Sequence, residues 1–228
     1  MAHLIVRFLI MMAGAGMLVM SPLCTAQPRL YIGAAGGIST LSADARTVLG
    51  SDQAATSSYK PENGPTAGVY LGVHGNDYLS VQADYLWNRN LLTLDALVSK
   101  TMGGGTALYE QTFRSHQHAA LGSVLLYFRP RSSWVRPFLS VGTGIVHLDT
   151  EAGTSAVSSG ISAPGPFSAT NAALHVAVGI DLKTKSGWAL RYSFAETSGA
   201  NPISSRLTPP GSRMLANFRN LFGVVKYF

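Results

Sequence analysis

The feature that most constrains the fold is a series of eight segments in which polar and apolar side chains alternate. The alternation is clearest in residues 187–197, where the large apolar side chains fall on one face: Trp188, Leu190, Tyr192 and Phe194. A period of two is that of a β-strand, whose successive side chains point to opposite faces. The predicted strands are residues 30–39, 66–74, 78–92, 107–129, 134–150, 170–184, 187–197 and 213–228.

The connections between these segments alternate between short and long. Three or four residues join the second strand to the third, the fourth to the fifth and the sixth to the seventh. The other four connections are rich in Gly, Ser, Asn and Pro and span residues 40–65, 93–106, 151–169 and 198–212. Short turns at one end and long loops at the other are typical of a bacterial outer-membrane β-barrel, in which the long loops face the outside.

The N-terminal segment, residues 1–26, predicts export. Arg7 precedes an apolar core, and small residues end at Ala26, which is the pattern of a signal peptide cleaved after that alanine. A retained membrane anchor would need a longer apolar run. Lipid attachment at Cys24 would need a small residue before it, and a leucine stands there. The mature chain, residues 27–228, is then one barrel domain without cysteine, so disulfides and cysteine-based metal sites are excluded.

The composition points the same way. Hydrophobic residues make up 46% of the chain and charged residues 12%, against about 25% charged residues in a typical globular domain. After the N-terminal segment no charge-free apolar stretch reaches about 18 residues, so strands rather than helices would cross a bilayer. A β-sandwich would bury the apolar faces between two sheets, but the export signal and the loop asymmetry favour a barrel in lipid. The formal charge of +6 is not gathered into a basic cluster with aromatics, so nucleic acid is not an expected partner.

Hairpin register tests this interpretation, because a slip of one residue turns every side chain to the wrong face. Turns at residues 75–77, 130–133 and 184–186 place apolar side chains opposite apolar side chains in all three short hairpins. The predicted pairs are Val73 with Leu79, Phe128 with Val135 and Leu182 with Trp188. The three hairpins therefore agree on which side of the sheet is apolar.

The opposite side predicts a polar network inside the barrel, made of Gln82, Asp84, Arg136, His175, Asp181 and Arg191. Eight strands leave an interior just wide enough for side chains, so a plug of paired charges is the expected role. Inward glycines at residues 68, 72, 142, 144 and 179 would thin the packing, which keeps a narrow pore as an alternative. Aromatic residues near strand ends are expected in the girdles at the membrane interfaces: Tyr85, Trp87, Tyr127, Trp134, Trp188, Tyr192 and Tyr227.

Three motifs carry a resemblance to a known family: the opening strand LYIGAAGGIS, the strand RPFLSVGTGI and the terminal NLFGVVKYF. They are similar to the small OmpA-like and OmpX-like outer-membrane β-barrels. The resemblance implies an all-β, eight-stranded antiparallel up-and-down transmembrane barrel with both termini in the periplasm. It also implies that the barrel-assembly machinery reads Phe222, Val224 and Phe228 at the C-terminus. Lys226 interrupts that pattern and leaves the inside-outside phase of the last strand open.

The expected partners and function follow from the same resemblance. The partners are outer-membrane lipids including lipopolysaccharide and, during biogenesis, periplasmic chaperones and the assembly machinery. We expect a monomer that needs no cofactor. The implied function is a non-enzymatic envelope or surface role, through adhesion or ligand contact by the four long loops. A narrow porin-like channel for small solutes is the alternative.

A cluster of histidines is the best candidate for other chemistry. His116 is predicted to pair with His147 on the outward face, with His118 beside them. Three imidazoles could bind a metal, but polar side chains at this height normally meet headgroups or water, so no metal site is expected. With Ser115 and Asp149 the cluster holds the residue types for acyl transfer, which keeps a lipid A-modifying enzyme as a third alternative. No serine here lies in a motif resembling those enzymes, so no catalytic residue is predicted.

Overall fold

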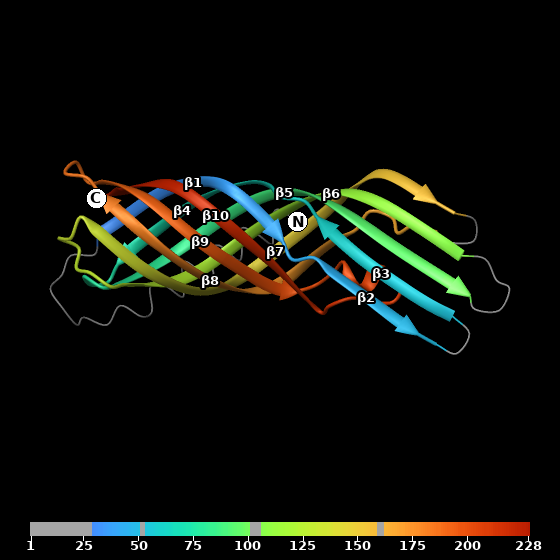
Figure 1. Cartoon of the computed structure of the whole chain (residues 1–228). Coiled ribbons are helices and arrows are strands. Elements are labelled where there is room, and N and C mark those ends of the chain that lie inside the picture. The colour runs from blue at the N-terminus through green and yellow to red at the C-terminus, as the bar shows by residue number, and fades with distance from the viewer. Residues whose placement is uncertain (1–28, 51–52, 101–105, 159–161) are drawn as a thin grey trace.

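The computed structural model describes residues 29–50, 53–100, 106–158 and 162–228, which form one antiparallel sheet of ten strands (Figure 1). The predicted signal peptide, residues 1–26, lies outside the described residues. No helix in the described part of the chain is long and apolar enough to span a bilayer. The elements are β1 Arg29–Leu41, β2 Asp44–Leu49, β3 Gln53–Pro61, β4 Gly64–His74, β5 Leu79–Lys100, β6 Thr106–Tyr127, β7 Val135–Val157, β8 Ser168–Lys183, β9 Trp188–Ala200, the short 3-10 helix η1 Ser204–Arg206 and β10 Met214–Tyr227.

Eight of the ten strands close into a ring. Around the ring the order is β5, β4, β1, β10, β9, β8, β7 and β6, and β6 pairs back onto β5. The first and last strands of the ring meet in register, with Tyr31 opposite Tyr227. Closure pairs the backbone of every ring strand on both sides and leaves no edge within the ring. The predicted all-β, eight-stranded antiparallel up-and-down barrel is confirmed.

The wall of the barrel carries its apolar side chains on the outside. On β9, Trp188 and Leu190 are 47% and 58% exposed, whereas Ala189 between them is 1% exposed. The same exposed apolar phase recurs around the ring at Ile32, Val69, Val81, Val124, Val176 and Phe222. A water-soluble sheet protein would bury these faces, whereas a barrel in lipid presents them. The predicted assignment of faces is therefore confirmed.

The register of the three short hairpins differs from the prediction. Each pairs with a shift of two residues, so that Val73 faces Val81, Leu126 faces Leu139 and Leu182 faces Leu190. The predicted pairs, such as Val73 with Leu79, are wrong because the turns are wider than the sequence suggested. In the first turn the Asn76 carboxamide oxygen accepts hydrogen bonds from the backbone N–H groups of Tyr78 and Leu79, at 2.8 Å each. A shift of two preserves the faces, since the side-chain period is two.

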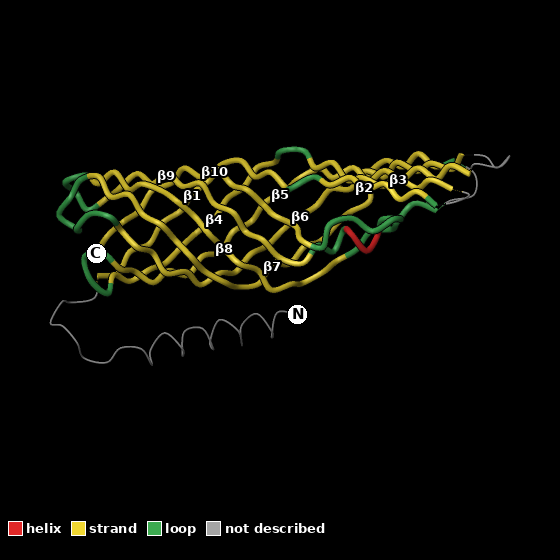
Figure 2. The backbone as a smooth tube through the Cα atoms, turned by 60° about the horizontal axis from the view of Figure 1, so that its bottom comes forward, coloured by secondary structure: helices red, strands yellow, loops and turns green. Residues whose placement is uncertain are grey.

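The long connections are more ordered than predicted. The predicted loop 40–65 contains β2 and β3, and β3 pairs with the far end of β5 from Gln53–Lys100 to Pro61–Leu92. Strands β5, β6 and β7 also continue past the ring into predicted loops 93–106 and 151–169. Together β2, β3 and the far ends of β5, β6 and β7 form a sheet that projects from one side of the barrel, here called the sheet extension (Figure 2). The predicted loop 198–212 likewise contains the end of β9 and η1.

The two ends of the barrel are therefore unlike. The turn end holds the three short turns, the start of β1 and the end of β10. The loop end holds the sheet extension and the connection from β9 to β10 (Figure 2). Side chains buried at the base of the extension form an apolar cluster here called the loop-end cap: Leu41, Tyr59, Leu92, Leu94, Ala96, Tyr109, Phe113, Leu148, Phe167, Ile203, Leu207 and Leu215.

Candidate functional site

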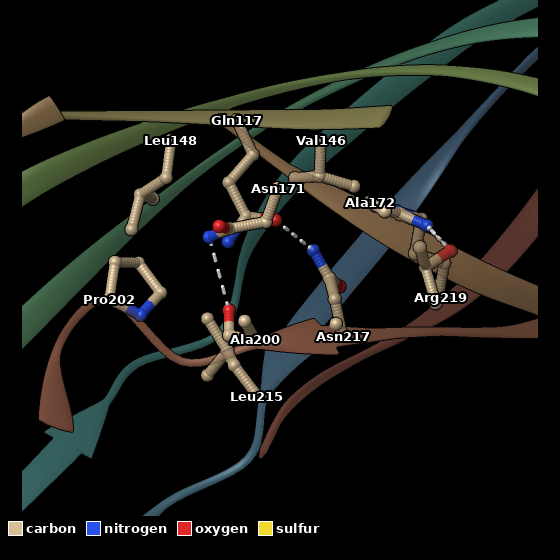
Figure 3. Close-up of a pocket in the computed structure, with 12 residues that line it drawn as sticks. Gln117, Val146, Leu148, Asn171, Ala172, Ala200, Pro202, Leu215, Asn217 and Arg219 are labelled. Carbon is tan, nitrogen blue, oxygen red and sulfur yellow. Dashed lines mark hydrogen bonds between the residues drawn. The ribbon is translucent and has the colours of Figure 1, made fainter. Parts of the chain in front are cut away.

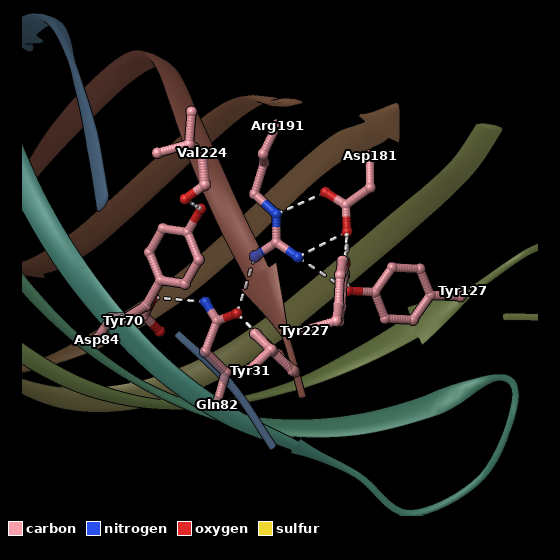
Figure 4. Close-up of polar contacts among 9 residues, drawn as sticks. All are labelled: Tyr31, Tyr70, Gln82, Asp84, Tyr127, Asp181, Arg191, Val224 and Tyr227. Atoms are coloured by element: carbon pink, nitrogen blue, oxygen red, sulfur yellow. Dashed lines mark hydrogen bonds and ion pairs between the residues drawn. The ribbon is translucent and has the colours of Figure 1, made fainter. Parts of the chain in front are cut away.

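The centre of the lumen is an ion pair between neighbouring strands. Arg191 on β9 donates from Nε to Oδ1 of Asp181 on β8 at 2.6 Å, and from Nη2 to Oδ2 at 2.8 Å (Figure 4). The two residues are 5% and 0% exposed. A fork of two parallel N–H donors on one carboxylate is the strongest geometry available to this pair.

Hydrogen bonds link this ion pair to β5 across the lumen. The carboxamide oxygen of Gln82 accepts from Arg191 Nη1 and from the Tyr31 hydroxyl, both at 2.9 Å, and its Nε2 donates to Asp84 Oδ1 at 2.6 Å (Figure 4). Asp84 also accepts from the Ser123 hydroxyl at 3.3 Å. The structure thus brings together four of the six predicted network residues. We call Tyr31, Gln82, Asp84, Tyr127, Asp181, Arg191 and Tyr227 the charged layer.

Two tyrosines in this layer were expected elsewhere. Tyr127 and Tyr227 were predicted in the interfacial girdles, but their hydroxyls donate to Asp181 Oδ2 at 3.2 and 2.5 Å. Arg191 Nη2 also donates to the Tyr127 hydroxyl at 2.9 Å. The girdle assignment of these two residues is wrong. The alternation of side chains predicts the inward position correctly, because Tyr127 is separated by an even number of residues from the inward Ser123 and Leu125.

The inward glycines make room for rings rather than thinning the packing. A Cβ at Gly72 would lie 2.2 Å from the Tyr31 ring, and a Cβ at Gly179 would lie 2.4 Å from the Phe138 ring. These rings lie flat against the bare backbone of the neighbouring strand, and the Arg191 guanidinium sits 4.8 Å from the Phe138 ring centroid. The prediction that these glycines loosen the interior around the arginines is wrong at both positions.

Arg136 on β7 faces Asp181 and borders the charged layer, but its hydrogen bonds go to the turn end. Its Nη2 donates to the Asp77 carbonyl oxygen at 2.9 Å and its Nε to the Arg129 carbonyl oxygen at 3.4 Å. Its guanidinium stacks 3.7 Å from the Tyr127 ring centroid. A further contact joins the β6–β7 turn to the β4–β5 turn: Arg131 Nε donates to Asp77 Oδ1 at 2.7 Å. That hydrogen bond lowers the pKa of the Asp77 carboxyl below its ordinary value.

A second polar layer lies toward the loop end. His175 Nδ1 is 3.1 Å from the Thr197 hydroxyl, which also accepts from Arg219 Nη1 at 2.7 Å. Asn217 Nδ2 donates to the carboxamide oxygens of Gln117 at 2.7 Å and Asn88 at 3.0 Å. We call this the amide layer, and its members are Asn88, Asn90, Gln117, His175, Thr197, Asn217 and Arg219.

The sequence pattern does not reveal Asn217 and Arg219 as inward residues, because Lys226 obscures the phase of the last strand. The three predicted assembly-signal residues are exposed on the outside: Phe222 and Val224 on β10 and Phe228 directly after it. Lys226 shares their outward phase, with Nζ 3.0 Å from the Ser186 carbonyl oxygen at the turn end. The odd-numbered residues of β10 therefore point into the lumen, and Arg219 is 0% exposed.

The loop-end cap closes the mouth above the amide layer. Ile203 and Leu207 of the β9–β10 connection are buried against Phe113 and Tyr59 of the extension. Asn201 fixes this connection, because its Nδ2 donates to the Tyr59 hydroxyl at 3.1 Å and its Oδ1 accepts from the Ile203 N–H at 3.0 Å. Burial raises the pKa of the Tyr59 phenol. The charged layer, the amide layer and the cap follow one another along the lumen, and cavities of about 30 and 40 Å³ lie among them.

The histidine cluster lies on the outside, as predicted, but with other partners. His118 faces His147 and His116 faces Asp149, so the predicted pair of His116 with His147 is wrong by two residues. The Nδ1 atoms of His118 and His147 are each 2.7 Å from a hydroxyl, those of Tyr85 and Thr170. Among the described residues no group of three His, Cys, Asp or Glu side chains is arranged to hold a metal.

The residue types for acyl transfer are divided by the barrel wall. Ser115 points inward, is 0% exposed and donates to the Asn90 carbonyl oxygen at 3.1 Å. It therefore lies on the opposite side of β6 from His116. Ser168 does lie beside the cluster, with its hydroxyl 3.5 Å from His147 Nε2. The other nitrogen of His147 meets the Thr170 hydroxyl rather than a carboxylate.

Comparison with known proteins places this geometry in a family. The family model described as outer membrane protein beta-barrel domain matches residues 8–207. Among solved structures, the neisserial surface protein NspA is similar over 87% of this chain and 97% of its own, with a TM-score of 0.50 and 16% identity. OprG of Pseudomonas aeruginosa is similar over 89% of this chain and 96% of its own, with a TM-score of 0.46 and 12% identity. No curated protein matches the sequence. The chain belongs to the outer membrane protein beta-barrel domain family, and this membership supports a location in the outer membrane.

Proposed function

We propose that the protein is a sealed, non-enzymatic outer-membrane barrel that acts through the surface of its loop end. The observation that carries this proposal is the filled lumen, in which the charged layer, the amide layer and the loop-end cap follow one another. A barrel closed in this way offers solutes no wide aqueous path. The sheet extension, by contrast, offers a large structured surface beyond the ring.

The orientation that fits this function places the turn end in the periplasm and the loop end outside the cell. Short periplasmic turns and long outer loops are the rule for such barrels. Both ends of the described barrel chain, β1 and β10, then begin and finish on the periplasmic side. Phe222, Val224 and Phe228 would present the assembly signal to the barrel-assembly machinery from the outer face of β10, after passage with periplasmic chaperones. We propose a monomer, since the ring closes on itself.

The outward histidines fit contact with lipopolysaccharide at the outer membrane boundary. His116, His118 and His147 lie on adjacent strands β6 and β7 above the apolar belt. Arg114 extends the same surface one step higher, where it faces Glu151 at 3.9 Å. Such exposed polar groups suit phosphate and sugar headgroups and are worth little to the stability of the fold.

Planar-bilayer recording of the refolded full-length barrel tests the sealed lumen. We expect no unitary current steps under applied voltage. The matched variant replaces Ile203 and Leu207 with serine, which weakens the cap but keeps both polar layers, and it is also expected to remain silent. Reproducible ohmic steps from the wild-type protein would instead favour a narrow channel for small solutes.

Mass spectrometry of lipid A tests the non-enzymatic assignment. Expression of the barrel is expected to leave the lipid A mass profile unchanged, because Ser115 and the histidines lie on opposite sides of the wall. A new lipid A mass that disappears in His147→Ala would show that the surface at Ser168 and His147 modifies lipid A. That result would contradict the non-enzymatic assignment.

Removal of the β2–β3 hairpin tests the surface role. Residues 43–62 are replaced by a short Gly-Ser linker, which leaves all eight ring strands in place. The variant is expected to fold but to lose the attachment of expressing cells to an epithelial monolayer. The matched control inserts the same linker into the turn at residues 75–78. Equal attachment by cells with the wild-type barrel, with the variant and with no barrel would overturn the surface role.

A further inference from the structure

Arg219 is a buried cation with no carboxylate beside it. Its side chain lies on β10 in the amide layer and is 0% exposed. It donates from Nη1 to the Thr197 hydroxyl at 2.7 Å and from Nη2 to the Asn88 carboxamide oxygen at 3.4 Å. Within the described ranges no carboxylate oxygen lies within 4.0 Å of it, in contrast to Arg191 with Asp181. Its Nε finds no hydrogen-bond acceptor among the residues that the structure describes.

The inward-facing charges of the strands do not balance. Among the described inward-facing residues the cations are Arg136, Lys183, Arg191 and Arg219, and the carboxylates are Asp84 and Asp181. Asp181 is engaged by Arg191, and Asp84 accepts hydrogen bonds from Gln82 and Ser123 and acts on Arg219 only from beyond ion-pair distance. A buried charge without a counter-charge is among the most costly features a fold can carry. A counter-ion from solution would remove that cost at Arg219.

A cavity of about 30 Å³ opens beside the Arg219 side chain (Figure 3). It is lined by Arg219, Asn217, Gln117 and Thr197 on its polar side and by Val146 and Leu148 among its apolar contacts. The Oδ1 atom of Asn217 is also buried without a partner. Two unpartnered polar atoms on side chains that line one cavity indicate an occupant, because native proteins satisfy nearly all such atoms. The volume suits a small ion with one water molecule, and that water supplies the donor that Asn217 Oδ1 lacks.

A weak seam in the barrel wall lies beside the cavity. The pairing of β8 with β9 stops at Ala173 and Gly199, whereas β8 continues to Ser168 while paired only with β7. Across this seam the Asn171 side chain donates from Nδ2 to the Ala200 carbonyl oxygen at 3.3 Å (Figure 3). Asn171 and Ala200 line the same cavity as Arg219. One side-chain hydrogen bond, rather than a full strand ladder, therefore closes the wall at this point.

We propose that this cavity binds one small monovalent anion of halide size, with the guanidinium of Arg219 as its main ligand and the Thr197 hydroxyl group beside it. The anion neutralises the charge of Arg219 and fixes the amide layer. Larger anions such as sulfate or gluconate are excluded by the volume of the cavity. The site needs no conduction through the barrel, so it is compatible with a sealed lumen and goes beyond the proposed surface function.

Urea unfolding of the refolded full-length barrel in detergent tests the site, with sodium chloride compared with sodium gluconate at equal ionic strength. A ligand that binds only the folded state raises the ratio of folded to unfolded protein by the factor 1 + [L]/Kd. We expect this ratio to rise by about tenfold at a chloride concentration ten times its Kd, relative to gluconate. Arg219→Met is expected to abolish the difference between the two salts. The matched control Arg129→Gln, at an exposed arginine of the turn end, is expected to keep it.

Crystals of the wild-type barrel grown in sodium bromide give a second measurement that does not depend on a variant folding. We expect an anomalous peak within hydrogen-bond distance of Arg219 Nε. Equal stability of the wild type in chloride and gluconate overturns the proposal. So does a folded Arg219→Met that keeps the chloride effect, or a bromide map with peaks only at the protein surface.

Discussion

Arg191 and Asp181 lie directly opposite each other on β9 and β8 and are joined by two hydrogen bonds of 2.6 and 2.8 Å inside the barrel. Further hydrogen bonds of the charged layer meet one of these two residues or the Gln82 side chain, and Gln82 joins the pair to β5. The pair thus ties together strands from opposite sides of the ring. Its desolvation cost is offset only while both partners and their tyrosines remain in place.

Arg191→Met is therefore expected to destabilise the barrel strongly. It leaves the Asp181 carboxylate buried with only tyrosine hydroxyls as partners, a type of change that costs about 3–5 kcal/mol. Urea unfolding of the barrel reconstituted in phospholipid vesicles measures the loss. The control is Arg114→Ala, which breaks an exposed pair of 3.9 Å and is expected to cost under about 1 kcal/mol. The double variant Arg191→Met with Asp181→Leu is expected to recover much of the lost stability. Equal losses of stability in Arg191→Met and in the control Arg114→Ala would contradict this account.

Gly72→Ala is expected to weaken the barrel through Tyr31. The new Cβ would lie 2.2 Å from the Tyr31 ring, so the ring must move and release its hydrogen bond to Gln82. Overpacking of this kind costs about 1–3 kcal/mol, measured as a lower urea midpoint. Gly165→Ala is the matched control, because nothing lies within 4 Å of its Cβ position. An unchanged midpoint in Gly72→Ala would show that the ring does not need the bare backbone.

The turn-end contact between Asp77 and Arg131 predicts a pH-dependent contribution to stability. The hydrogen bond from Arg131 lowers the pKa of the Asp77 carboxyl in the folded state below its ordinary value of 3.8. A carboxyl whose pKa is lower in the folded state stabilises the fold at every pH above its unfolded-state pKa. This stabilisation is lost as the pH falls through the folded-state pKa. The stability difference between wild type and Asp77→Asn is therefore expected to be constant from neutral pH to about pH 5 and to disappear as the pH falls below the folded-state pKa. A difference that grows on acidification would reverse the sign and refute the assignment.

The fold was predictable from the sequence because parity carries most of the information in a barrel wall. Side-chain alternation gave the correct face for Trp188 and Arg191, and it does not depend on the exact register. The register itself was wrong by two residues in each short hairpin, since a shift of two preserves every face. Turn width is set by local contacts such as the Asn76 side chain, which alternation does not report.

The parts that were not predictable depend on partners distant in the sequence. Strands β2 and β3 are rich in small and polar residues and are ordered by backbone pairing with the far end of β5, which no local pattern announces. Tyr127 was assigned to a girdle because its residue type outweighed its parity. Arg219 was missed because one lysine at residue 226 obscured the phase of β10. Parity applied without regard to residue type would have placed both residues inside.

Trp188 tests the outward face directly. Its side chain is 47% exposed, and it lies opposite Lys226 of the neighbouring strand β10. A barrel with Trp87 and Trp134 replaced by phenylalanine leaves Trp188 as its one tryptophan, which can be excited selectively. In vesicles of brominated phospholipid its emission is expected to be strongly quenched. Bromines near the headgroups should quench it more than bromines at the bilayer centre, because the Lys226 ammonium lies 5.2 Å from its ring and needs contact with water or headgroups. A tryptophan at Phe167 of the loop-end cap, in a background without the other three, is expected to escape quenching. Equal emission from both proteins in brominated and ordinary lipid would mean that the apolar face of β9 does not meet the membrane.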